Sequence, residues 1–140
     1  MSEFSELLGK IIIKIERVLD RDEEVILIHL SNGAIYKQFH EHDCCESVTI
    51  DDINGDLNDL VGYPLLQAEE SSSDASNSNT DSATWTFYKM ATRKGYVTIR
   101  WYGTSNGYYS ERATFDKIKE EDPIREQRKK KLEKIKNANN

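Results

Sequence analysis

The sequence is poor in the features that mark several common protein classes. It holds two prolines and two cysteines in 140 residues, and it has no run of the roughly eighteen apolar residues that a membrane-spanning helix needs. The N-terminus lacks the basic start and apolar stretch of a signal peptide. Cys44 and Cys45 are adjacent, and neighbouring cysteines rarely bridge each other without strain. We therefore expect no membrane segment, a cytoplasmic location and two free thiols.

Charge is unevenly distributed along the chain. The formal net charge is −6. Residues 123–140 carry seven basic and two acidic side chains, which leaves a net charge of −11 on residues 1–122. An acidic surface repels phosphate backbones, so a nucleic-acid contact is expected only through the basic tail. The tail holds no aromatic residue that would stack on bases.

Short runs of β-branched and aromatic residues predict most of the fold. Residues 24–30 are apolar on both faces, as a central buried strand would be. Asn32-Gly33 separates this run from residues 34–39, and the dipeptide is a strong hairpin signal because both turn residues adopt positive φ. Further strands are predicted over residues 84–90, 96–102 and 108–115, with Asn106-Gly107 joining the last two.

Alternation of apolar and polar residues assigns a core face to two of these strands. The predicted core residues are Ile11, Ile13 and Ile15 in the run 10–18, and Val97, Ile99 and Trp101 in the run 96–102. The opposite face of the second run carries Tyr96, Arg100 and Tyr102. This face is suited to solvent or to a partner.

Two segments predict helices. Asp51 and Asp52 are suited to cap a central amphipathic helix that ends before Pro64. Asp122-Pro123 is typical of a helix start and predicts a basic C-terminal helix. Residues 69–82, rich in Ser, Asn and Asp, predict a flexible acidic loop. The expected fold class is α+β, an antiparallel hairpin and meander sheet with these two helices. Residues 1–117 would form the domain and residues 118–140 the basic tail.

The segment from His40 to Glu46 concentrates side chains that carry chemistry. Imidazole and thiolate are the usual zinc ligands. In an extended strand His40, His42 and Cys44 would project to one side, which predicts a metal site. The same residues also allow a cysteine nucleophile with a histidine base. Acidic neighbours oppose that alternative because they raise the pKa of a thiol. A third interpretation is a plain strand with one buried cysteine.

Two further surfaces are candidate binding sites. The run 52–59 resembles the opening of a calcium loop, but Leu57 stands where that loop requires glycine and Tyr63 where it requires a carboxylate. A capped helix explains the run better. The remaining candidate binding residues are acidic or aromatic, with one arginine: Asp51, Asp52, Asp56, Arg100, Trp101, Tyr102, Tyr108 and Tyr109.

Several motifs together resemble a family of small bacteriophage proteins of unknown function. The motifs are FHEHDCCESV at 39–48, INGDL at 53–57, TWTFYK at 84–89, VTIRWYG at 97–103 and SNGYYS at 105–110. The resemblance covers about residues 8–115. It implies a non-structural phage protein in the host cytoplasm, and it implies no particular activity.

Three functions follow as hypotheses. The first is a non-enzymatic protein that binds a host factor, in the manner of proteins that counter a host defence system. The second is sequestration of a small nucleotide-type signalling molecule, with Arg100 and Lys89 on phosphate and tyrosines on the base. The third is a metal- or cysteine-dependent enzyme centred on the His/Cys segment. The sequence identifies no cofactor.

Overall fold

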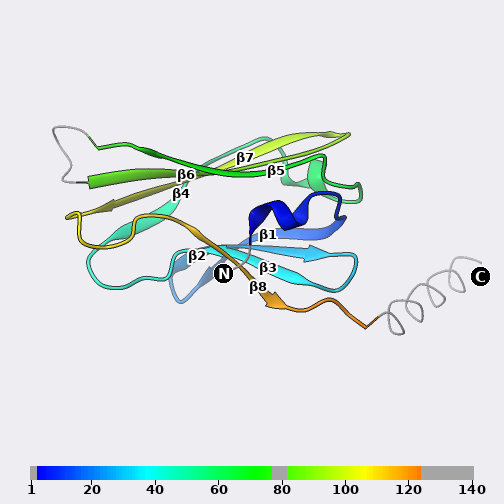
Figure 1. Cartoon of the computed structure of the whole chain (residues 1–140), viewed down its shortest axis with the longest axis horizontal. Coiled ribbons are helices and arrows are strands. Elements are labelled where there is room, and N and C mark those ends of the chain that lie inside the picture. Colours follow the sequence, from blue (N-terminus) through cyan, green and yellow to red (C-terminus); the bar gives the residue numbers. More distant parts are fainter. Residues whose placement is uncertain (1–2, 77–81, 124–140) are drawn as a thin grey trace, which may run out of the picture.

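Two antiparallel four-stranded sheets form a β-sandwich (Figure 1). The computed structural model describes residues 3–76 and 82–123. The first sheet has the order β1 (Ile12–Asp20), β2 (Glu23–Leu30), β3 (Ile35–Phe39) and β8 (Thr114–Lys119). The second has the order β4 (Ser47–Asn54), β7 (Gly95–Ser105), β6 (Ser82–Thr92) and β5 (Gln67–Asp74).

The core lies between the two sheets. Phe4, in the short 3-10 helix η1 (Phe4–Leu7), contacts Tyr88 of one sheet at 4.8 Å and Phe115 of the other at 4.9 Å, measured between ring centroids. Trp101 is 1% exposed, and its indole N–H donates to the Gln38 side chain across the sandwich at 3.3 Å. Burial of these large rings supplies much of the apolar area that stabilises the fold.

The expected α+β class is wrong, because the described residues contain no α-helix. The predicted central helix divides into the end of β4 and a single 3-10 turn, η2 (Leu57–Leu60). Ile50 and Ile53 pair with Trp101 and Ile99 of β7, so pairing with a buried strand prevails over local helix signals. The predicted C-terminal basic helix falls on residues 124–140, outside the described residues. Within the described ranges no helix is long and apolar enough to span a membrane.

Two further expectations change. A β-bulge between Ile12 and Lys14 shifts the register of β1, so Ile12 is fully buried while Ile13 is 57% exposed. The predicted core face is therefore wrong for Ile13, whereas Ile15 packs against the core as expected. β5 extends to Asp74, so residues 69–74 of the expected loop are strand instead. These residues pair with β6 through backbone hydrogen bonds, which do not require apolar side chains.

The two Asn-Gly turns have different outcomes. Gly33, at φ +92°, lies between β2 and β3, which confirms the first hairpin. Asn106-Gly107 instead begins a crossover, because β8 pairs with β3 in the opposite sheet and not with β7. The predicted core face of β7 is confirmed, since Val97, Ile99 and Trp101 are buried.

The crossover from β7 to β8 requires a residue without a side chain at position 103. A Cβ on Gly103 would lie 2.1 Å from the carbonyl oxygen of Glu111 and 2.8 Å from its carbonyl carbon. We expect Gly103→Ala to lower the free energy of unfolding by about 3 kcal/mol or more, the upper end of the usual cost of overpacking. Gly107→Ala is the control, because Gly107 has positive φ but no neighbour within 4 Å, and it should cost about 1 kcal/mol. Urea denaturation followed by tryptophan fluorescence measures both, and equal losses would contradict the close approach.

Candidate functional site

Three connections meet at one end of the sandwich, on the left of Figure 1. They are the β1–β2 turn, the β3–β4 loop (residues 40–46) and the β7–β8 crossover (residues 106–113), and we call this region the loop end. A pocket of about 330 Å³ lies between the first two, and a second pocket of about 270 Å³ joins the β3–β4 loop to Ser110 of the crossover. Binding sites are frequently built on such loops, because a rigid scaffold positions them.

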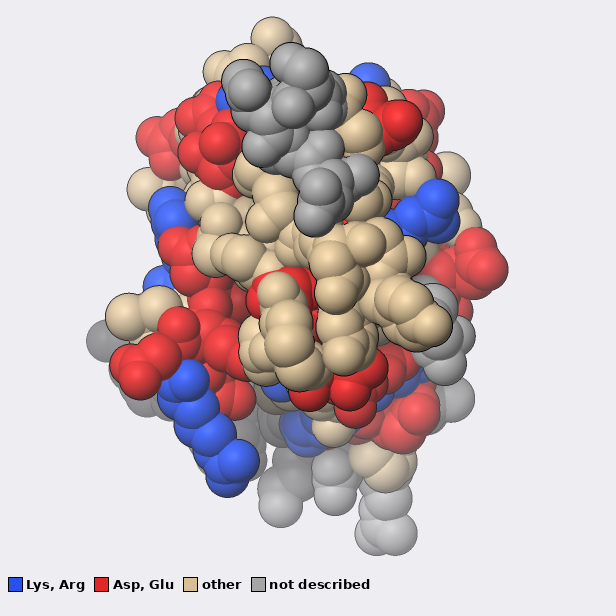
Figure 2. Space-filling view, turned by 90° about the vertical axis from the view of Figure 1, so that its left-hand side faces the viewer, with Lys and Arg blue, Asp and Glu red and all other residues tan. Residues whose placement is uncertain are grey.

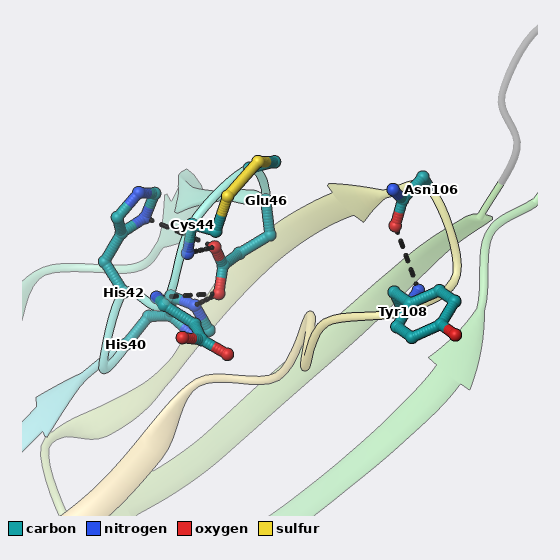
Figure 3. Close-up of a disulfide and its surroundings, with 8 residues drawn as sticks. His40, His42, Cys44, Glu46, Asn106 and Tyr108 are labelled. Carbon is teal, nitrogen blue, oxygen red and sulfur yellow. Dashed lines mark hydrogen bonds and ion pairs between the residues drawn. A yellow bond between two sulfur atoms is a disulfide. The ribbon is translucent and has the colours of Figure 1, made fainter.

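Glu46 lies between His40 and His42 in the β3–β4 loop (Figure 3). Its Oε2 is 3.0 Å from His40 Nε2, and its Oε1 is 3.6 Å from His42 Nδ1. The side chains of His40 and Glu46 are buried, whereas that of His42 is 45% exposed. One ligand atom from each of the three residues lies within 4.8 Å of the other two.

The orientation of His40 is fixed from the crossover. Its Nδ1 lies 2.9 Å from the carbonyl oxygen of Arg112. A carbonyl only accepts hydrogen bonds, so Nδ1 carries the hydrogen and donates it. This contact ties the β3–β4 loop to the crossover and directs Nε2 at Glu46.

Glu46 remains ionised although it is buried. Burial opposes ionisation of its carboxyl, but hydrogen bonds from the Cys44 amide, from His40 and from the Asp43 amide outweigh burial and lower the pKa to about 2. The two amides donate at 2.9 Å and 3.1 Å. Glu46 thus organises the β3–β4 loop around a buried negative charge.

The cysteines differ from expectation. Cys44 and Cys45 are joined by a disulfide, so neither is a thiol in the structure. β3 ends at Phe39 and the following residues form a loop, so the side-chain alternation of a strand does not apply to them. Cys44 therefore does not lie with His40 and His42. The third side chain of this cluster is that of Glu46 instead.

The crossover presents an exposed aromatic ring on a turn held by its own hydrogen bonds. The Asn106 side chain accepts from the Tyr108 amide at 3.1 Å, and the Ser105 hydroxyl accepts from the Gly107 amide at 2.9 Å. Tyr108 is 90% exposed, and the Tyr109 ring lies 6.4 Å from its ring. Viewed from this end, the molecule has uncharged side chains at its centre and charged ones around them (Figure 2).

A second buried carboxylate anchors this turn. Glu111 accepts hydrogen bonds from the hydroxyls of Ser82 and Thr84 on β6, at 3.1 Å and 2.8 Å, and from Ser105 at the end of β7. Burial opposes its ionisation, but these hydroxyls, with that of Ser105 first, hold the pKa of Glu111 below its ordinary value. The crossover is therefore fixed at Glu111 as well as at Arg112.

The other predicted binding residues do not join this cluster. Trp101 belongs to the core. On the outer face of the second sheet, Arg100 is bonded to Asp51 and its guanidinium lies 4.7 Å from the Trp85 ring. Tyr102 packs on Trp85. Asp52 is exposed beside Arg100 in the β4–β7 ladder, and Asp56 caps η2 by accepting from the Asn58 amide at 2.9 Å.

Sequence reasoning missed the two carboxylates that hold the loop end together. Glu46 stands four residues after His42, and this spacing within the His/Cys segment was a usable signal. Glu111 carried no local signal, because its three hydroxyl partners come from residues 82, 84 and 105.

The anchoring role of Glu111 predicts a pH dependence of stability. A carboxyl whose folded-state pKa is lowered stabilises the fold above its unfolded pKa of about 4.3 and loses this contribution as the pH falls through the folded value. We expect Glu111→Gln to be about 1–3 kcal/mol less stable at pH 7, because neutral hydrogen bonds are weaker. The difference should shrink below pH 4. Thermal unfolding from pH 7 to pH 2 measures it, and parallel curves would contradict the anchor.

Comparison with known proteins gives a family but no activity. The family described as domain of unknown function (DUF7448) matches residues 5–115, which is most of the chain. No curated protein and no solved structure matches the chain. The matched span includes both sheets up to the start of β8, the two buried carboxylates and the tyrosine-bearing crossover. The chain belongs to the DUF7448 family.

Proposed function

We propose that the domain is a non-enzymatic binding module that recognises a protein partner through its loop end. The observation that carries this proposal is the presentation of Tyr108, a large ring that is almost fully exposed on a turn fixed by hydrogen bonds. An aromatic side chain in this position is costly to leave in water, and such rings supply much of the energy of protein interfaces.

The hydrogen bonds that fix the crossover support binding, because its conformational entropy is already reduced before a partner binds. Asn106 and Ser105 fix the turn, Glu111 fixes its C-terminal side, and Arg112 is held by His40. A tyrosine loses few rotatable bonds when it is bound. Less conformational entropy is then lost on association, and the affinity rises accordingly.

Charge around the loop end favours a partner of complementary sign. The exposed acidic residues of this end are Asp20, Asp22, Glu23, Glu41 and Asp43, and its exposed basic residues are Arg21 and Arg112. A partner with an uncharged centre and a basic rim would meet this arrangement, and rim charges mainly raise the association rate.

We further propose, from the resemblance of the sequence motifs to those of small bacteriophage proteins, that the partner is a host protein. In a phage, a small protein of this kind would bind a host factor, such as a component of a defence system, in the host cytoplasm. The alternative of a nucleotide-type ligand has weaker support, because Asp51 and Trp85 already engage Arg100. A cysteine-dependent enzyme has weaker support as well, because Cys44 is bonded to Cys45.

The proposal predicts that binding is lost when the two tyrosines of the crossover are changed. We expect Tyr108→Ser with Tyr109→Ser to reduce capture of a host protein from bacterial lysate at least tenfold, since rings of this kind each contribute about 2 kcal/mol or more. Capture on immobilised full-length chain, quantified by mass spectrometry, measures the loss.

Tyr96→Ser is the matched control. Tyr96 is 65% exposed but follows the β6–β7 turn, which is at the opposite end of these strands from the loop end. This variant should capture the same protein as the wild type, and added salt should weaken capture by both. Equal capture by the crossover variant and the wild type would contradict the proposal, as would a wild type that enriches nothing.

A further inference from the structure

We propose that His40, His42 and Glu46 form a zinc site at the loop end. This inference goes beyond the proposed binding function and does not depend on it. The two histidines were predicted as ligands from the sequence, and the structure replaces the expected Cys44 with a carboxylate. Two imidazoles and one carboxylate also make up the protein ligands of many zinc enzymes, with a further position open to water.

The distances between the donor atoms fit the ion. Zinc binds histidine nitrogen and carboxylate oxygen at about 2.0–2.2 Å, so the ligand atoms of a tetrahedral site lie roughly 3.3 Å apart. Glu46 Oε2 is 3.0 Å from His40 Nε2, and Glu46 Oε1 is 3.6 Å from His42 Nδ1. One ligand atom from each of the three residues lies within 4.8 Å of the others. Closure around an ion therefore requires only small movements of the exposed His42.

The contacts of His40 favour a positive charge beside its Nε2. Nδ1 donates its hydrogen to the Arg112 carbonyl, so a neutral His40 presents a lone pair at Nε2. That lone pair would face the carboxylate of Glu46 across 3.0 Å. Two acceptors at this distance repel each other, so Nε2 either carries a hydrogen that it donates to Glu46 when no ion is bound or binds a metal ion that takes the place of that hydrogen. A backbone carbonyl on the far nitrogen is also one of the common outer partners of a metal-bound histidine.

The donor set selects the class of metal. Imidazole nitrogen suits zinc, copper, nickel and iron, whereas calcium and magnesium prefer oxygen ligands. Thiolate is absent, because the only two cysteines of the chain are bonded to each other. Among these metals we propose zinc, because it binds to three protein ligands with one coordination position open and undergoes no redox chemistry.

An ion can reach the site from solvent. His42 is 45% exposed, and the pocket of about 330 Å³ is lined by His40, His42 and Glu46. The same pocket is lined by the acidic Asp22, Glu23 and Glu24 and by the basic Arg21, so its charged lining is net negative and favours entry of a cation.

Zinc titration of the full chain, purified without a histidine tag and treated with EDTA, tests the site. We expect one equivalent of zinc to bind the wild type, in competition with a chromogenic chelator. His42→Ala should weaken binding at least tenfold. This variant is chosen because His42 is exposed, so the buried pair of His40 and Glu46 is left intact. Cobalt substitution provides a second readout, since cobalt in a four-coordinate site absorbs visible light far more strongly than the free aqua ion, and His42→Ala should abolish these bands.

Two control variants distinguish this site from zinc binding elsewhere on the chain. His29→Ala removes the remaining histidine, which lies on β2 beside Glu16, and it should bind zinc like the wild type. Replacing Cys44 and Cys45 with serine should also leave the affinity unchanged. The proposal is overturned if the wild type binds no zinc at micromolar concentration, if His42→Ala binds as tightly, or if the cysteine variant loses binding.

Discussion

The loop end depends on one constraint, which is that a carboxylate removed from water requires hydrogen-bond donors around it. Glu46 obtains these donors from two amides of its own loop and from His40. Glu111 obtains them from hydroxyls on β6 and β7. Each carboxylate thus draws separate pieces of chain together, and the connection from His40 to the Arg112 carbonyl joins the two groups. The β3–β4 loop and the crossover therefore each take their shape in part from a buried carboxylate.

The parts of the fold that sequence could predict are those set by neighbouring residues. The hairpin at Gly33 and the buried face of β7 each follow from a few consecutive side chains. Asn106-Gly107 predicts a hairpin equally well from its local sequence. It begins a crossover instead, because the next strand, β8, pairs with β3 of the other sheet. The prediction of a central helix is wrong for a similar reason. Pairing with β7 stabilises the residues around Asp51 more than helical capping would.

The sequence predicts two of the three residues of the proposed zinc site. His40 and His42 stood out by their chemistry, and the structure brings them together. The third member could not be chosen from a strand pattern, because the chain leaves β3 at Phe39 and turns Glu46 inward through amide contacts. The exposed Tyr108 was identified by residue type alone. Its fixed presentation depends on the local hydrogen bonds of Ser105 and Asn106 and also on Glu111, which bonds to residues distant in sequence such as Thr84.

The two proposals, partner binding by the crossover and zinc binding, rest on different atoms of the same end. Recognition of a partner uses the ring of Tyr108, whereas the metal proposal uses His40, His42 and Glu46. The two meet at Arg112, which accepts from His40 and directly follows the Glu111 anchor. A metal ion would affect partner binding if it shifted His40 and, through that hydrogen bond, the crossover, or if its charge offset those of Glu41 and Asp43 in the pocket that they share with His42. Because His40 and Glu46 are already buried and in contact without an ion, the geometry favours two functions that share a scaffold and are weakly coupled.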